Sequence, residues 1–193
     1  MKIIPLGGSI LGGRQQRAPD WVSIGNPDLT DKRATHPVLL PPGGFLNDYV
    51  PFYFTPFSVM MRNIHTGWGG IRQRPNEEIL ILVSSMHHIT GLDVRWLFTD
   101  SHAYYQWANF YDDLAHLDKI DWLLLQQRNF KRNPDDPGQF ERYQAEALIH
   151  RHLPIGGLLG IVCYTEGLKL AIEQQLAARN LELPVYARTG WYF

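Results

Sequence analysis

Short apolar runs, separated by polar and proline-containing segments, dominate the hydrophobic pattern of this 193-residue chain. Residues 79–83 form a continuous apolar run between charges and serines, which predicts a strand buried on both faces. Residues 48–56 predict a strand whose prolines suit an edge or a bulge. Further strands are predicted over residues 21–24, 158–164 and 183–188. Residues 140–154 begin as a polar, charged lead-in and become a short run with strand character that stops at Pro154.

Helical spacing of apolar residues is clearest over residues 166–179, where it predicts an amphipathic helix. A second helix, capped by Asp100 or Ser101, is predicted as far as residue 111. This assignment puts three of its aromatic side chains in the core, namely Trp107, Phe110 and Tyr111. Shorter helical segments are predicted over residues 119–127 and 31–33, the latter capped by Asp28 or Thr30.

Proline and glycine predict where regular structure stops. Residues 37–44 predict a stiff loop, residues 62–78 a hairpin or an exposed loop, and residues 129–142 a polar loop broken by prolines. Strands and helices do not alternate regularly along the chain. The predicted fold class is therefore α+β, with residues 1–193 as one domain whose first 20 residues are a mobile loop or a frayed terminus.

Composition narrows the range of functions. The formal net charge of −1 excludes a uniformly basic nucleic-acid coat but leaves room for a local basic groove. A single cysteine, Cys163, excludes an intrachain disulfide framework and favours a reducing, cytoplasmic setting. No stretch approaches the roughly 20 apolar residues that cross a bilayer, so no membrane association is expected. The glycines near the start lack the Gly-Lys-Ser/Thr of a phosphate-binding loop.

Glu146 is the most informative single residue. It lies between Ala145 and Ala147 and precedes an apolar run, and a carboxylate in such a setting is costly to bury unless it has a partner. Small neighbours leave room for a ligand. We hypothesise that Glu146 is catalytic; the alternative from the residues alone is a surface salt-bridge partner.

Several blocks of the chain, in order from about residue 21 to the end, carry a family resemblance. The chain resembles the DarT toxins, bacterial DNA ADP-ribosyltransferases of toxin–antitoxin systems. The blocks are Lys32-Arg33 before Pro41-Pro42-Gly43-Gly44, Asp48-Tyr49-Val50-Pro51-Phe52-Tyr53-Phe54, Leu82-Val83-Ser84-Ser85, Phe98-Thr99-Asp100-Ser101-His102, Gln144-Ala145-Glu146 and Trp191-Tyr192-Phe193.

This resemblance implies an ADP-ribosyltransferase fold, a mixed and split β-sheet core around a cleft for NAD+. It also implies transfer of ADP-ribose from NAD+ to a base in single-stranded DNA, in a sequence-dependent way, with release of nicotinamide. The partner it implies is a DarG-like antitoxin with a macrodomain that removes ADP-ribose. By the same resemblance, Arg33 matches the catalytic arginine, Glu146 the catalytic glutamate and the loop before Glu146 the substrate-recognition loop.

The chemistry of the transfer suggests roles for further residues. An arginine fork suits a pyrophosphate, so Arg33 is expected to bind NAD+ as well as to support catalysis. Tyr53 or Phe52 can stack on nicotinamide. Contacts with DNA are expected from the residues of the recognition loop and its flanks, Arg128, Phe130, Lys131, Arg132 and Arg142. NAD+ is the expected co-substrate, and no metal is expected.

Two other hypotheses stay open. The family usually opens with a strand carrying a His-x-Thr element that holds the NAD+ ribose, and this chain begins after it. The chain is thus alternatively a catalytically impaired homologue that binds DNA or NAD+. A third hypothesis is a metal hydrolase, because His150 and His152 would share one side of a strand and His87-His88 could join them.

Overall fold

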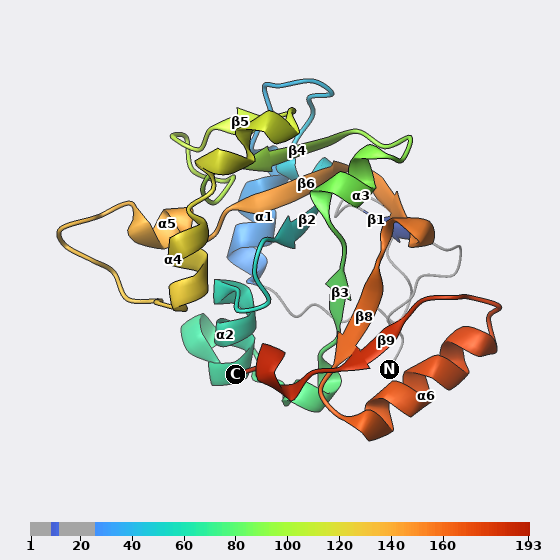
Figure 1. The fold of residues 1–193 in the computed structure, drawn as a ribbon. Helices are drawn as coiled ribbons and strands as arrows, with labels where there is room; N and C mark the ends of the chain where they lie inside the picture. The colour runs from blue at the N-terminus through green and yellow to red at the C-terminus, as the bar shows by residue number, and fades with distance from the viewer. Residues whose placement is uncertain (1–8, 12–25) are drawn as a thin grey trace.

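The structure is a computed structural model that describes residues 9–11 and 26–193 (Figure 1). Its strands are β1 (Ser9–Leu11), β2 (Tyr49–Tyr53), β3 (Ile81–Val83), β4 (Trp96–Thr99), β5 (Phe110–Tyr111), β6 (Glu146–His150), β7 (His152–Pro154), β8 (Gly160–Cys163) and β9 (Val185–Ala187). Its α-helices are α1 (Pro27–Thr35), α2 (Val59–Thr66), α3 (Met86–Thr90), α4 (Trp122–Gln127), α5 (Gln139–Arg142) and α6 (Glu166–Ala177).

Strand β6 lies inside a four-stranded sheet of order β2-β6-β4-β5 and pairs antiparallel with both of its neighbours. Residues 146–149 of β6 are all buried. Successive side chains of a strand point to opposite faces, so Glu146 and Leu148 share one face and Ala147 and Ile149 the other. Leu148 packs with Leu97 and Ala103. The strand that carries Glu146 is therefore covered on both sides.

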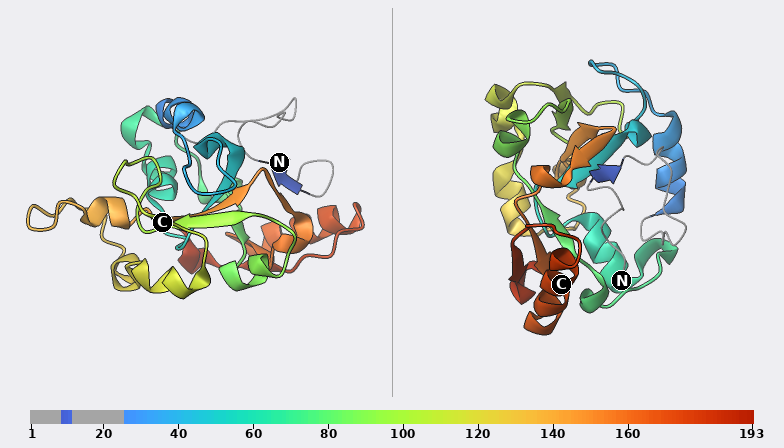
Figure 2. Two further views of the ribbon diagram at one scale, coloured as in Figure 1. Left: turned by 90° about the horizontal axis from the view of Figure 1, so that it is seen from above. Right: turned by 90° about the vertical axis from the view of Figure 1, so that its right-hand side faces the viewer.

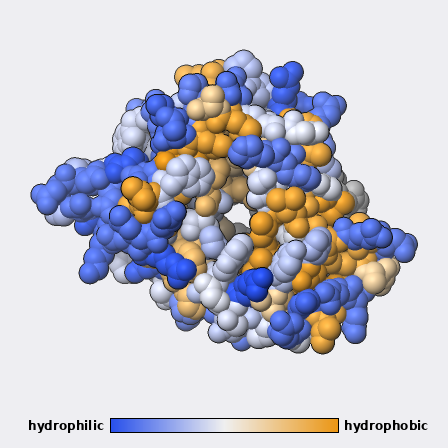
Figure 3. Space-filling view, viewed as in Figure 1, coloured by the Kyte–Doolittle hydropathy of each residue, from blue (hydrophilic) through white to orange (hydrophobic). Residues whose placement is uncertain are grey.

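A second sheet of order β3-β8-β9 completes a split core, and a short β1–β7 pair adds two more strands. The β8–β9 pair is parallel, whereas the other ladders are antiparallel. Helix α6 packs Ile172 and Leu176 against this second sheet, and it runs beside β9 in Figures 1 and 2. Figure 3 shows the molecule hollowed near its centre, with hydrophobic residues on the side where β3 and β8 run. Mixed pairing and flanking helices confirm the α+β class.

The prediction of a helix over residues 101–111 is wrong. The segment forms turns followed by β5, because the carboxylate of Asp100 accepts hydrogen bonds from the Asn109 backbone amide at 3.1 Å and from the Asn109 side-chain amide at 2.7 Å. The Tyr111 hydroxyl donates to the same carboxylate at 3.2 Å. These bonds close a loop, which we call the Asp100 loop (residues 100–109). Trp107 is 64% exposed rather than part of the core.

Other predicted elements differ in extent. Strand β3 is only half-buried, since it lies at the edge of its sheet. Helix α2 occupies the first part of residues 62–78, where Ser58 caps it by accepting from the Met61 amide at 3.1 Å. The predicted strand at residues 21–24 and most of the first 20 residues lie outside the described residues. The strands near 48–56, 158–164 and 183–188 and the helix from residue 166 are confirmed.

Strand β6 should be the part of the fold most sensitive to loss of side-chain volume. Leu148 is fully buried, so Leu148→Ala leaves a cavity and should lower the free energy of unfolding by about 2–5 kcal/mol. Urea denaturation measures this change. Leu39→Ala is the control, because Leu39 is 90% exposed. Equal effects of the two substitutions would contradict the central place of β6 in the core.

Candidate active site

Helix α1 brings Arg33 to the site. Asn26 caps the helix by accepting from the Leu29 amide at 3.3 Å, and Pro27 occupies a first-turn position where its missing N–H costs nothing. This corrects the predicted caps, Asp28 and Thr30. Arg33 lies in the last turn, where the helix dipole favours a cation. From there its side chain reaches across to the first residue of β6.

Glu146 and Arg33 form a buried ion pair. Nη1 of Arg33 donates to Oε1 and Oε2 of Glu146 at 3.1 and 3.0 Å, and the side chains are 11% and 1% exposed. The backbone amide of Ala103 donates to Oε1 at 3.0 Å, and Nδ1 of His102 lies 3.4 Å from the same oxygen. Arg33 is therefore the partner that a buried Glu146 requires, and the Asp100 loop contributes two further groups.

The charges of this cluster follow from burial and from Arg33. Burial by itself raises the pKa of Glu146, but Arg33, His102 and the Ala103 amide lower it below its ordinary value. Burial lowers the pKa of His102, although Glu146 opposes the shift. The backbone amide of Tyr104 donates to Nδ1 of His102 at 3.3 Å, so a neutral ring carries its proton on Nε2. Glu146 is thus an anion and His102 a neutral imidazole near neutral pH.

One donor of this cluster is left over. Nη2 of Arg33 is buried and has no hydrogen-bond partner among the described residues. A buried guanidinium nitrogen without an acceptor is costly, so a ligand oxygen at that position would be stabilising. Phosphate and ribose oxygens have the required chemistry.

The two aromatic residues predicted to stack on nicotinamide lie on opposite faces of β2. Tyr53 pairs in register with Glu146, so both side chains share one face, and burial and the Glu146 charge raise the pKa of Tyr53. Phe52 pairs with Ala147 and packs against the hydrophobic core on the other face. The structure brings Tyr53 to the site but not Phe52.

The five residues predicted to contact DNA fall into two groups. Three of them are engaged within the protein: Arg128 lies over the Phe57 ring at 3.3 Å, Phe130 packs on Tyr143 and Phe193, and Arg142 pairs with Asp136 and Asp121. The other two, Lys131 and Arg132, are exposed, as Arg128 also is. Nη1 of Arg132 also bonds the buried Glu141 at 3.0 Å.

Sequence reasoning missed three groups around Glu146. Besides His102 and the Ala103 amide, the Thr99 hydroxyl lies 3.3 Å from both the amide and the carbonyl of Glu146. Thr99 and His102 belong to a block that carries the family resemblance. That block was a signal for their importance, but nothing in its spacing places them beside Glu146.

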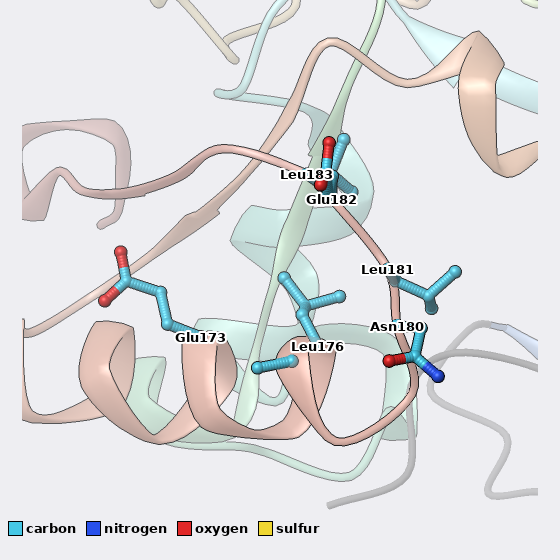
Figure 4. A pocket seen from close by; sticks show the side chains of 7 residues that line it. Glu173, Leu176, Asn180, Leu181, Glu182 and Leu183 are labelled. Atoms are coloured by element: carbon cyan, nitrogen blue, oxygen red, sulfur yellow. The ribbon is translucent and has the colours of Figure 1, made fainter.

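The histidines do not converge on a metal site. Arg151, with φ of 65°, separates His150 at the end of β6 from His152 in β7. Nε2 of His88 instead lies 2.8 Å from the Gly156 carbonyl. Within the described ranges, no group of three or more His, Cys, Asp or Glu side chains could hold a metal ion. The pocket of Figure 4 is separate from the Arg33–Glu146 cluster, since residues of α6 and of the segment before β9 line it.

Comparison with solved structures gives the class to which this fold belongs. Thermus sp. 2.9 DarT in complex with ADP-ribosylated single-stranded DNA superposes with a TM-score of 0.88 at 31% identity, covering 96% of this chain and 88% of that one. The same protein in complex with NAD+ gives a TM-score of 0.81 at 31% identity, with the same coverages. The expected ADP-ribosyltransferase fold is confirmed.

Sequence comparison then gives the family. A model described as "ssDNA thymidine ADP-ribosyltransferase, DarT" matches residues 9–193. A DNA ADP-ribosyl transferase of Escherichia coli O127:H6 (strain E2348/69 / EPEC) is 58% identical over 182 residues, which are 94% of this chain and 84% of that protein. The chain therefore belongs to the DarT family of DNA ADP-ribosyltransferases. In the described part of the chain, no helix is long and apolar enough to cross a membrane.

The lowered pKa of Glu146 depends on Arg33. Since the folded-state pKa lies below the ordinary 4.5, the pair stabilises the fold above that pH, and this stability is lost as pH falls through the folded-state value. In Arg33→Ala, burial is no longer opposed by the guanidinium, so the pKa of Glu146 should rise.

Carboxyl titration by NMR, and urea unfolding from about pH 3 to about pH 7, measure this change. Arg74→Ala, which removes the exposed Arg74–Glu78 pair, is the matched control and should leave the Glu146 titration unchanged. A pKa of Glu146 that stays low in Arg33→Ala would refute the assigned cause.

Proposed function

We propose that the buried Arg33–Glu146 pair catalyses transfer of ADP-ribose from NAD+ to the thymine base of a thymidine in single-stranded DNA. The observation that carries the proposal is the geometry of this pair, an ionised carboxylate fixed by a guanidinium and a backbone amide. The family description supplies the thymidine and the single-stranded substrate. We also propose that residues 1–193 act as one transferase domain, in the cytoplasm.

The reaction breaks the bond between the anomeric carbon of ribose and the nicotinamide nitrogen, and the electron pair leaves with nicotinamide. Positive charge develops on the sugar, and the negative Glu146 stabilises it. A new bond forms between that carbon and the attacking atom of the base. The ring nitrogen of thymine that is not bound to its deoxyribose carries a proton, which must be lost when this nitrogen attacks.

The proton that thymine loses needs an acceptor at the site. Arg33 lowers the pKa of Glu146, so this carboxylate is a weaker base than an ordinary glutamate. His102 is neutral and lies 3.4 Å from Glu146, but the lone pair of its Nδ1 accepts from the Tyr104 amide. We therefore assign both charge stabilisation and proton transfer to Glu146.

Two residues are proposed to hold NAD+. The unpartnered Nη2 of Arg33 suits a phosphate or ribose oxygen. Tyr53, on the same face as Glu146, offers a ring to nicotinamide. Phe52 is left out of this role because its side chain packs on the opposite face of the sheet.

For DNA, Lys131 and Arg132 are the proposed contacts in the loop before Glu146, because both are exposed cations. Arg142 and Arg128 are proposed to hold that loop in place through the Asp136 carboxylate and the Phe57 ring. Phe130 contributes to the packing beneath the loop.

Loss of the Glu146 charge should abolish transfer without unfolding the protein. Glu146→Gln keeps an acceptor for Arg33 and for the Ala103 amide but removes the negative charge, so turnover should fall by about 10²-fold or more. Nicotinamide release and the mass shift of a thymidine-containing single-stranded oligonucleotide measure it. An oligonucleotide without thymidine should gain no mass.

Glu182→Gln, a substitution of an exposed carboxylate next to the pocket of Figure 4, is the matched control and should keep full activity. Undiminished turnover in Glu146→Gln would refute the catalytic role of the Glu146 charge. Binding of NAD+ by calorimetry, without any mass shift of DNA by the unsubstituted protein, would instead favour the catalytically impaired homologue.

We further propose that the enzyme is a growth-arresting toxin paired with a DarG-like antitoxin whose macrodomain removes ADP-ribose from DNA. Family membership supports this proposal. Modification of a thymine base blocks normal pairing, and reversal then requires a hydrolase specific for the new bond.

Induced expression in a bacterial host should therefore stop growth, whereas expression of Glu146→Gln should not. Co-expression of a macrodomain that removes ADP-ribose should restore growth and erase the adduct from isolated DNA. Growth arrest that persists in Glu146→Gln at equal protein level would show that toxicity does not come from transfer.

A further inference from the structure

A row of aromatic rings leads from the catalytic carboxylate to the surface along the Asp100 loop. Nδ1 of His102 lies 3.4 Å from Glu146, and the Tyr105 ring meets the His102 ring edge-on with centroids 5.7 Å apart. The Trp107 ring stacks on Tyr105 at 4.6 Å, with an angle of 19° between the planes. Each ring thus touches the next, from the buried site to an exposed tryptophan.

The loop holds these rings in fixed positions. Besides the Asp100 bonds at its neck, the Tyr105 amide donates to the His102 carbonyl at 3.0 Å, and the Ala108 amide donates to the Tyr105 carbonyl at 3.1 Å. The His102 amide donates to the Glu141 carbonyl at 3.0 Å, which ties the loop to α5. The loop before Glu146 and the Asp100 loop are therefore joined next to the active site.

Trp107 keeps a large free surface. It is 64% exposed although Tyr105 covers one of its faces, so the other face is open to solvent. Such a ring is poorly suited to water and well suited to stacking on another flat ring. The cation of Lys32 lies 5.9 Å from the ring centroid of Tyr104, and the Tyr104 and Tyr105 centroids are 6.1 Å apart. Aromatic faces and cations on one loop and its neighbour are the groups that single-stranded nucleic acids bind.

We infer that Trp107, backed by Tyr105, is a stacking platform for the nucleobase next to the modified thymidine in single-stranded DNA. This inference rests on the proposed function, because the target base must lie at Glu146 for its neighbour to reach Trp107. A base in the strand is favoured over the adenine of NAD+ because the platform is joined to the proposed DNA-contacting loop through α5. Every base has a flat face, so the platform contributes affinity for single strands more than sequence preference.

The test compares Trp107→Ala and Trp107→Phe with the unsubstituted enzyme, in transfer to an oligonucleotide that carries a single target thymidine. Removing the ring should lower kcat/KM for DNA by about 5- to 100-fold, mainly through KM, as expected for loss of one stacking contact. Trp107→Phe should restore most of it. KM for NAD+ should stay within about twofold of the unsubstituted value, because the contact is to the DNA base.

A second comparison changes the DNA instead of the protein. Two oligonucleotides carry an abasic site, one just before the target thymidine and one just after it. The unsubstituted enzyme should modify one of the two more slowly than the intact oligonucleotide. The same abasic site should cost Trp107→Ala little, since the stacking partner is already gone. Trp68→Ala is the matched control, because Trp68 is 68% exposed but lies outside the loop, and it should behave as the unsubstituted enzyme.

Three results would overturn the inference while leaving the proposed function standing. The first is a kcat/KM for DNA in Trp107→Ala that stays within about twofold of the unsubstituted value. The second is an equal loss of activity in both proteins when the oligonucleotide carries the abasic site. The third is that Trp107→Ala raises KM for NAD+ and leaves KM for DNA unchanged. The last would assign the platform to adenine. Absence of transfer to any single-stranded DNA by the unsubstituted protein would overturn both the proposed function and this inference.

Discussion

The ion pair between Arg33 and Glu146 is the interaction on which the active site depends. It joins residues 113 positions apart, from the last turn of α1 and the first residue of β6. The guanidinium lowers the pKa of a carboxylate that is 1% exposed, and the carboxylate offsets the cost of burying the guanidinium. The pair therefore sets the charge of the site and links α1 to β6. Nη2 of Arg33, which has no hydrogen-bond partner among the described residues, is the atom proposed to meet a substrate oxygen.

The residues around this pair come from a sheet strand and from two loops. Strand β6, buried on both faces, holds Glu146 in the sheet, and two loops supply the groups around it. The loop before Glu146 is held by Arg142 between two carboxylates, and the Asp100 loop is held by the Asp100 carboxylate at its neck. Both loops meet where the His102 amide donates to the Glu141 carbonyl. The proposed catalytic groups and the proposed DNA contacts are thus kept in one arrangement before substrate arrives.

The local pattern of apolar and polar residues predicted those helices and strands that form from local spacing. The amphipathic helix at the start of α6 and the strands around β2, β8 and β9 follow from the spacing of apolar residues. The same logic failed over residues 101–111, where helical spacing suggested a helix. Hydrogen bonds that the Asp100 carboxylate accepts from Asn109 and Tyr111 outweigh the weak helical propensity of this aromatic segment, so Trp107 faces solvent instead of the core.

By itself the sequence determined the family and the α+β class and predicted Arg33 and Glu146 as site residues, because these inferences depend on residue identity and order. Only the tertiary structure decided what surrounds them. Strand register put Tyr53 on the face of Glu146 and Phe52 on the other, and chain closure brought His102 and the Ala103 amide to the carboxylate. It also showed that Arg128, Phe130 and Arg142 are engaged within the protein while Trp107 is exposed. These are contacts between segments distant in sequence, and no local pattern of apolar and polar residues encodes them.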